Sequence, residues 1–144
     1  MTKPGPRKLK KYPLKDKKKL FFLKEERNPK YDLEERTAKF GEDIIEFSKS
    51  VPQTVVTLPL IGQLVDAGTS VGANYCEAND AESRKDFRHK IGICKKESRE
   101  SKFFLRMIVK AVPELKKEGE CLMREAQELN LIFGAIRRKT EATI

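Results

Sequence analysis

The stretch RKDFRHKIGICKKESRESKFFLRMIVKAV, residues 84–112, carries the most regular pattern in the chain. Small and apolar residues recur in it at alternating intervals of four and three, which is a heptad spacing. Such spacing places them on one side of a long helix, as in helices that pack lengthwise against one another. Ser83 with Asp86 forms an N-terminal capping pair, and Pro113 ends the helix. The residues that recur at alternating intervals of four and three are Phe87, Ile91, Cys94, Ser98, Ser101, Leu105, Ile108 and Val112.

Three other segments repeat this spacing. The first, capped by Asp32 with Glu35 and ended by Pro52, carries Thr37, Phe40, Ile44, Phe47 and Val51. The second starts near Pro59 and carries Ile61, Leu64, Gly68, Val71, Tyr75 and Ala78. The last carries Leu115, Gly119, Leu122, Ala126, Leu129, Phe133 and Ile136. Four helices with short connections predict an all-α fold, an antiparallel up-down-up-down four-helix bundle over residues 31–144.

The first 30 residues differ in composition from the rest of the chain. The 144 residues and 16.6 kDa fit one domain and carry a net charge of +9. Residues 1–30 hold twelve Lys and Arg against three Asp and Glu, whereas residues 31–144 hold nineteen of each. We therefore predict a basic, proline-rich N-terminal arm on a neutral domain. The arm either attracts a polyanion or is only a solubilising tail. Its apolar run LFFL, residues 20–23, is expected to dock on the domain or on a neighbouring subunit.

The composition and the cysteine pattern exclude several classes of protein. The apolar stretch 103–112 is interrupted by charge well before the roughly 20 residues that a membrane span needs, so we expect no membrane protein. The three cysteines form no CxxC pair, and their odd number cannot close fully within the chain, which is typical of reduced thiols. No apolar segment long enough for a signal peptide follows the basic N-terminus. These features indicate a cytoplasmic protein.

The chain lacks the motifs that catalysis or metal binding would need. A di-metal helical bundle uses paired Glu-x-x-His motifs, but this chain has one histidine, His89, three residues after Asp86. It has no glycine-rich phosphate loop. Glu97 and Glu100 lie among lysines and arginines, where ion pairs within the helix are the ordinary explanation. We therefore expect no enzyme, no catalytic residue, no cofactor and no metal site.

One helix concentrates positive charge within the neutral domain. Residues 84–110 contain ten Lys and Arg and three acidic residues. This pattern fits a solvated face balanced by acidic helices, or a surface that binds the phosphates of RNA or DNA when several copies assemble. No aromatic residues for base stacking are interleaved, which favours nonspecific binding. On the nucleic-acid hypothesis the binding residues are Lys8, Lys10, Lys11, Lys17, Lys18 and Lys19 of the arm and Arg84, Lys85, Arg88, Lys95 and Arg99 of the helix.

We call the row of heptad positions along each predicted helix its seam. Two further groups of residues lie beside the seams. Ser70, Asn74 and Glu77 share one face of the second helix. Asn74 and Glu77 either bond the backbone or an arginine across the turn, Arg84 or Arg88, or they meet a partner chain. The third helix also has a second apolar stripe, which indicates a subunit interface or, alternatively, a larger core within one monomer. The interface residues on the first interpretation are Phe103, Phe104 and Met107.

The run GTSVGANYCEANDAESRKDFRHKIGICKKESRESKFFLRMI, residues 68–108, resembles the signature of the bacterial four helix bundle proteins, also called intervening-sequence proteins of the 23S rRNA genes. The segments YDLEERTAKFGEDII and EAQELNLIFGAI extend the resemblance over roughly residues 31–137. The characteristic residues are Ser70, Asn74, Glu77, Phe87, Lys96, Glu97, Glu100 and Leu105.

The resemblance implies a left-handed antiparallel bundle that assembles as a homopentamer and has no catalytic residues. The family's link to rRNA inserts, and its similarity to the accessory protein of diversity-generating retroelements, point toward nucleic acid or nucleoprotein partners, although a fold alone does not fix a function. Our first hypothesis is a non-enzymatic oligomeric scaffold that binds RNA or DNA nonspecifically. The alternative is a protein-interaction module that recognises a protein partner, with the arm stabilising the oligomer.

Overall fold

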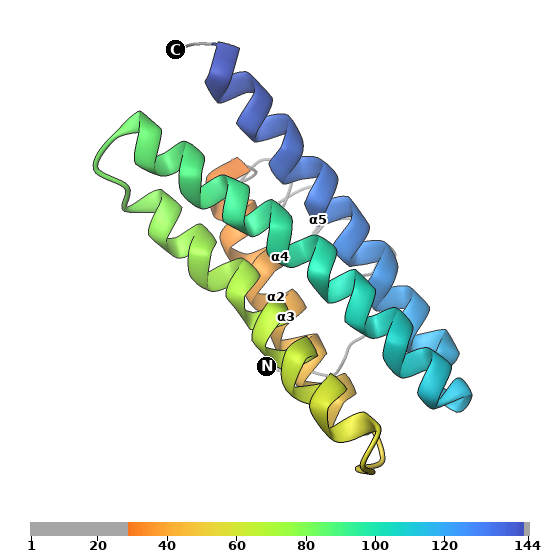
Figure 1. The fold of residues 1–144 in the computed structure, drawn as a ribbon. Helices are drawn as coiled ribbons and strands as arrows, with labels where there is room; N and C mark the ends of the chain where they lie inside the picture. The colour runs from red at the N-terminus through yellow and green to blue at the C-terminus, as the bar shows by residue number, and fades with distance from the viewer. Residues whose placement is uncertain (1–28, 143–144) are drawn as a thin grey trace, which may run out of the picture. The chain divides into compact units, whose positions relative to one another are not determined.

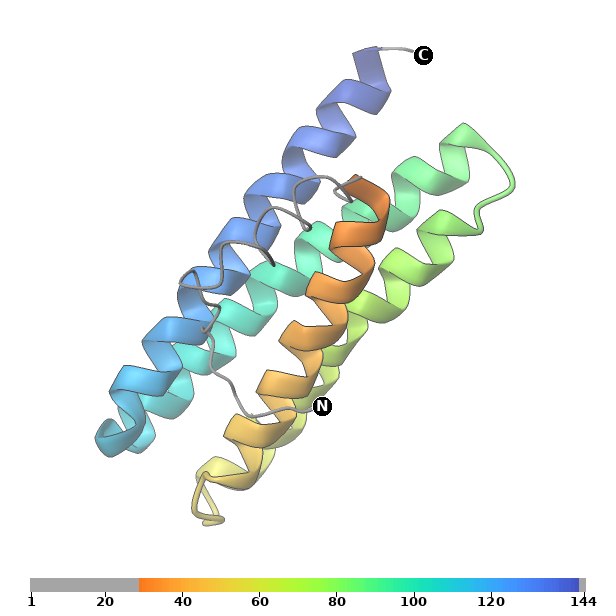
Figure 2. The same ribbon diagram turned by 180° about the vertical axis from the view of Figure 1, so that it is seen from behind.

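The computed structural model describes residues 29–142, which form an all-α bundle with no strand within that range. The four α-helices are α2 (Pro29–Lys49), α3 (Thr57–Asn79), α4 (Arg84–Ala111) and α5 (Lys116–Ala142). A short 3-10 helix, η1 (Pro113–Leu115), joins α4 to α5. Figure 1 and Figure 2 show each helix running antiparallel to the next, so the predicted up-down-up-down bundle is confirmed. Within the described helices none is long and apolar enough to cross a membrane.

The seam predicted for α4 is the centre of the core. Ile91, Cys94, Leu105 and Ile108 are fully buried, as are the two serines of the seam. Ser98 and Ser101 donate their hydroxyl hydrogens to carbonyl oxygens one turn earlier in α4, at 2.8 Å each, so these polar groups are satisfied within their own helix. The two ends of the seam, Phe87 and Val112, are partly buried against the core.

Helices α3 and α5 pack against α4, and the predicted seams of all three other helices contribute to the core. The buried side chains are Leu33, Thr37, Phe40, Ile44, Phe47 and Val51 from α2 and the following turn, Leu64, Val71, Tyr75 and Ala78 from α3, and Ala126, Leu129 and Phe133 from α5. Tyr75 and Phe133 pack across the core with ring centroids 5.9 Å apart. The predicted heptad spacing therefore places the core correctly in each helix.

Glycine allows α2 and α3 to approach closely. A Cβ atom added at Gly68 would lie only 2.8 Å from Ile44 Cγ1 and 2.9 Å from its Cγ2. The Ile44 side chain thus occupies the volume that any larger residue at position 68 would need. This contact fixes the spacing of the two helices at their middle.

Of the two side-chain caps predicted for α2 and α4, the one at α4 forms. Ser83 Oγ accepts a hydrogen bond from the Asp86 backbone N–H at 3.0 Å, and α4 ends before Pro113, both as predicted. The prediction that Asp32 caps the first helix is wrong, because α2 begins at Pro29 and Asp32 lies in its first turn. Proline suits the first turn, since its fixed φ is helical and its missing N–H would have no helical partner there.

The turn before α3 is held by two threonines. Thr54 Oγ1 accepts hydrogen bonds from the backbone N–H groups of Val56 and Thr57. The buried Thr57 hydroxyl donates to the Pro52 carbonyl oxygen, which ties the end of one helix to the start of the next. Between them Val55 is 91% exposed. The predicted first-turn position of Pro59 is confirmed.

Candidate nucleic-acid interface

The cations predicted on the third helix are distributed along α4. Arg84 and Lys85 are exposed in the first turn, Arg88 and Lys95 are half-buried, and Arg99 is exposed. Residues 88, 95, 99, 102 and 106 follow at intervals of seven, four, three and four, so they share one face of the helix. We call the set Arg88, Lys95, Arg99, Lys102 and Arg106 the basic stripe.

The basic stripe lies along α5. Arg88 Nη2 is 3.0 Å from Glu141 Oε1, and its buried Nε has no hydrogen-bond partner within the described part of the chain. Lys102 Nζ donates to Gln127 Oε1 at 2.8 Å. The Lys95 backbone carbonyl accepts from the Asn130 side chain, also at 2.8 Å. These contacts align the stripe with the outer edge of α5.

Two arginines of α5 join this surface, and sequence reasoning missed them. A Cβ added at Gly92 would lie 3.1 Å from Arg137 Nε, and a Cβ added at Gly134 would lie 3.2 Å from Lys95 Cε and 3.5 Å from Arg138 Nη1. Lys95 and Arg138 therefore both lie beside Gly134 of α5, and Arg137 lies against Gly92, three residues before Lys95 in α4. We call Lys95, Arg137 and Arg138 the cation triad. Gly92 and Gly134 lie off the heptad seams, and this was the signal in the sequence that two side chains cross there.

The acidic residue Glu97 lies on the other side of α4, toward α3. Ion pairs within the helix were expected for Glu97, but none forms among residues 33–141, because the positions three and four residues away are Ile93, Cys94, Glu100 and Ser101. Burial raises the pKa of the Glu97 carboxyl above its ordinary value, and the charges of Glu100 and of Asp66 on α3 raise it further. The Glu97 carboxylate thus lies on the α3 side of α4, whereas the basic stripe lies along α5. Lys90 is a cation of α4 on the α3 side, where it pairs with Glu77.

Three polar residues that carry the family resemblance, Ser70, Asn74 and Glu77, lie on α3. Asn74 Nδ2 donates to the Ser70 carbonyl oxygen at 2.9 Å, and Ser70 Oγ donates to the Asp66 carbonyl oxygen at 2.6 Å. Asn74 therefore bonds the backbone, which was one of the two expectations for it. Glu77 Oε1 accepts from Lys90 Nζ at 2.6 Å, which raises the pKa of that ammonium, while Arg88 pairs with α5 instead. Lys96 and Glu100 are exposed.

The second apolar stripe of α4 divides into two parts. Phe104 packs against the core, and Phe103 meets it edge to face with ring centroids 5.2 Å apart. Phe103 remains 51% exposed, while Met107 is partly buried. Part of the stripe thus enlarges the monomer core, and Phe103 is left on the outer surface.

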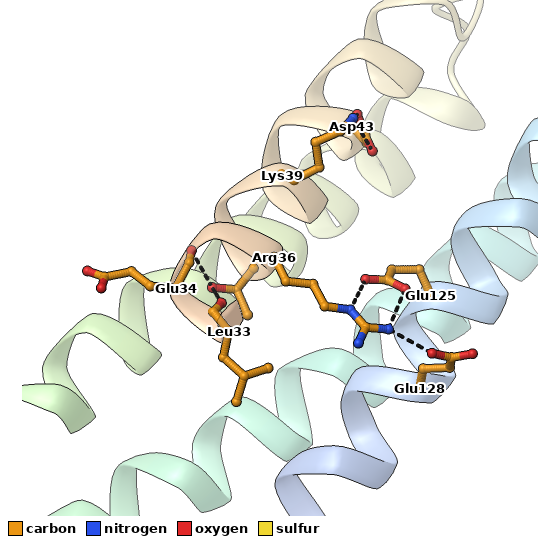
Figure 3. Close-up of polar contacts among 8 residues, drawn as sticks. Leu33, Glu34, Arg36, Lys39, Asp43, Glu125 and Glu128 are labelled. Carbon is orange, nitrogen blue, oxygen red and sulfur yellow. Dashed lines mark hydrogen bonds and ion pairs between the residues drawn. The ribbon is translucent and has the colours of Figure 1, made fainter. Parts of the chain in front are cut away.

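An ion-pair cluster between α2 and α5 lies outside the basic stripe (Figure 3). Arg36 Nε and Nη2 donate to the two carboxylate oxygens of Glu125 at 2.7 and 2.9 Å, and Nη2 also reaches Glu128 at 2.7 Å. These hydrogen bonds, first of all those to Glu125, hold the pKa of the Arg36 guanidinium above its usual range. The lysine Lys39 on the same helix pairs with Asp43 and takes no part in the cluster.

The thiol of Cys94 and the possible metal ligands of the described residues bear on catalysis and metal binding. Burial raises the pKa of the Cys94 thiol to about 12, so this thiol stays protonated near neutral pH. Among residues 29–142 no three His, Cys, Asp or Glu side chains come close enough together to hold a metal ion. A surface hollow of about 480 Å³ along α5 is lined by side chains of both charges, Lys102, Glu120, Met123, Arg124, Gln127 and Glu128. The predicted arm residues Lys8, Lys10, Lys11, Lys17, Lys18 and Lys19 lie outside the described residues.

The chain is similar to one solved structure and to one protein-family model. A solved structure from Bacteroides thetaiotaomicron, described as a protein of unknown function from the S23 ribosomal protein family, is 26% identical, with a TM-score of 0.65. The match covers 72% of this chain and 96% of that one. The search of curated proteins found no match. The model of the 23S rRNA-intervening sequence protein family matches residues 30–134, which is most of the chain. The protein therefore belongs to the 23S rRNA-intervening sequence protein family.

Proposed function

We propose that this chain is a non-enzymatic, homo-oligomeric helical scaffold that binds RNA or DNA without sequence preference. The binding surface is the basic stripe of α4 together with Arg137 and Arg138 of α5. The N-terminal arm, with its net charge of +9, adds to the attraction.

The basic stripe of α4 along α5 is the observation that supports this proposal most strongly. The bundle as a whole is neutral, so its positive charge could be spread among carboxylates. Instead Arg88, Lys95, Arg99, Lys102 and Arg106 share the face of α4 that lies along α5, and within the described residues Arg88 alone among them forms an ion pair. A concentrated positive surface raises the local concentration of a polyanion and speeds its association. Phosphates bind such a surface whatever the base sequence.

The assembly part of the proposal is based on Phe103. A phenylalanine that is half exposed beside a second ring costs free energy in water, and a second copy that covers it recovers that cost. The resemblance to the bacterial four helix bundle proteins implies five copies. Repeating the basic stripe in each copy multiplies the number of phosphates that one assembly contacts.

Binding is tested by a salt titration against a fluorescent 20-nucleotide RNA and a DNA duplex of unrelated sequence. We compare the full chain with one that begins at Pro29, where α2 starts. We expect both proteins to bind both ligands at low salt, with the logarithm of affinity falling linearly against the logarithm of salt concentration and more steeply for the full chain. Equal slopes would remove the arm from the proposal. No binding at low salt would overturn it and favour a protein partner.

Assembly is tested by multi-angle light scattering at micromolar concentration. We expect a mass five times the 16.6 kDa of one chain. The variant Phe103→Glu should lower that mass, and Val55→Glu is the matched control, because Val55 is even more exposed but lies on the α2–α3 turn. A monomeric full chain, or an unchanged mass for Phe103→Glu, would contradict the assigned interface.

A further inference from the structure

We propose that the cation triad, Lys95, Arg137 and Arg138, is a site for one phosphate group of a nucleic-acid backbone. The inference rests on the proposed function and deepens it, because it assigns binding to three positioned side chains as well as to diffuse positive charge. The site is shared between two helices, and no single segment of sequence contains it.

Two glycines position the triad. The Arg137 guanidinium lies against the α4 backbone at Gly92, where a Cβ would come within 3.1 Å of Nε and 3.2 Å of Cζ. Lys95 lies against the α5 backbone at Gly134, and Arg138 Nη1 reaches the same point. Long cationic side chains on a helix surface usually keep many rotamers, and ordering them opposes binding. Contact with a glycine backbone limits those rotamers before any ligand arrives.

Within the part of the chain that the structure describes, the triad has no carboxylate partner. Elsewhere on the bundle Arg36, Lys39, Lys49, Arg88 and Lys90 each form an ion pair. Among residues 33–141 no carboxylate lies within ion-pair distance of the Lys95, Arg137 or Arg138 side chains. Like charges on neighbouring turns of α4 and α5 repel one another, and an anion bound beside them reduces that repulsion.

The chemistry of the triad fits a phosphate. A guanidinium presents parallel N–H donors that match two oxygens of a phosphate, whereas the lysine ammonium adds a single compact charge. The basic stripe continues from the triad through Arg99, Lys102 and Arg106, so a polymer with phosphates at regular intervals follows the same surface. A nucleic-acid backbone therefore satisfies both the triad and its surroundings.

The first test changes the position of the triad without changing any charge. In Gly92→Ala/Gly134→Ala the new methyl groups displace Arg137 and Lys95, while the net charge remains +9. Gly62→Ala is the matched control, because a Cβ at Gly62 of α3 meets nothing within 4 Å. Affinity for the 20-nucleotide RNA is measured by fluorescence anisotropy across a salt series, with a thermal melt to check folding.

We expect Gly92→Ala/Gly134→Ala to weaken RNA binding about fivefold at low salt and to reduce the salt slope by about 1, as the loss of one phosphate contact does. Gly62→Ala should bind as the unaltered chain does. Equal binding by the double variant and by the control would overturn the site while leaving the proposed function intact. If the unaltered chain does not bind RNA, both proposals fail.

A second pair of variants covers the case in which the double alanine variant folds poorly. Arg137→Gln/Arg138→Gln removes two charges of the triad, and Lys116→Gln/Lys117→Gln removes two exposed charges from the first turn of the same helix. The first pair should reduce affinity and salt slope clearly more than the second. Equal losses would show that binding follows net charge alone and would overturn the site.

Discussion

The Arg36 guanidinium on α2 binds both carboxylate oxygens of Glu125 on α5, through hydrogen bonds of 2.7 and 2.9 Å. The two residues are 89 positions apart in the sequence, and their side chains are 28% and 31% exposed. The pair therefore joins the first and last helices of the bundle at its surface. A two-point contact of this kind fixes orientation as well as distance.

Arg36→Met tests the strength of this contact. We expect the free energy of unfolding to fall by about 1 kcal/mol, because the pair is partly screened by water. A double-mutant cycle with Glu125→Gln, measured by urea denaturation, isolates the coupling between the two side chains. Additive single changes would mean that the pair contributes nothing beyond its separate contacts.

Gly68→Ala should destabilise the bundle by about 1–3 kcal/mol, because the new methyl group meets Ile44 at 2.8 Å and the core is already filled. Gly62→Ala on the same helix has open space around it and should stabilise the protein by up to about 1 kcal/mol through helix propensity. Thermal and urea melts of both variants measure the difference. A change of stability in the same direction for both variants would contradict the close approach of α2 and α3.

The three thiols should differ in reactivity. Cys76 and Cys121 are exposed, whereas Cys94 is buried with its pKa raised to about 12. A thiolate-directed reagent such as a disulfide dye at pH 8 should label two thiols quickly in the native protein and the third only after denaturant is added. Rapid labelling of three thiols without denaturant would show that the core opens at α4.

Glu97→Gln should stabilise the protein in a pH-dependent way. Burial raises the pKa of the Glu97 carboxyl in the folded state, so folding favours its protonated form. The stabilisation that this group contributes is complete at low pH, below its unfolded pKa of about 4.3, and is lost as pH rises through the raised folded pKa. Glutamine has no carboxyl to ionise, so Glu97→Gln does not lose this stability. Its free energy of unfolding should therefore exceed that of the unaltered protein by an amount that grows as pH rises over this window. Parallel pH profiles for the two proteins would count against the burial effect.

The local sequence predicted the fold because the heptad spacing of all four helices agreed with the proline positions between them. The heptad positions Ile91, Cys94, Leu105 and Ile108 are buried, and Ser83 caps α4 where the sequence placed the cap. These features depend on residues within one or two turns of each other, so they can be read without knowing the neighbouring helix.

The candidate interface was only half predictable from the sequence. The cations of α4 could be counted along one helix. Lys95 lies beside Arg138 at Gly134, and Arg137 lies against Gly92, only because of the register between α4 and α5, which no local pattern encodes. The expected ion pairs of Glu97 failed for a similar reason. Counting charges by composition ignored which face of the helix each one occupies.

The two buried serines of the α4 seam bear on which positions of the chain tolerate substitution. Ser98 and Ser101 return their hydroxyl hydrogens to their own helix, so their polarity carries no information about which helix lies opposite. These two positions can exchange serine for alanine without leaving a neighbour's polar atom unsatisfied. Choice of neighbour is left to shape, where Ile44 fits against Gly68, and to the surface pair of Arg36 with Glu125. We therefore expect the buried polar positions to vary among related chains more freely than glycine 68.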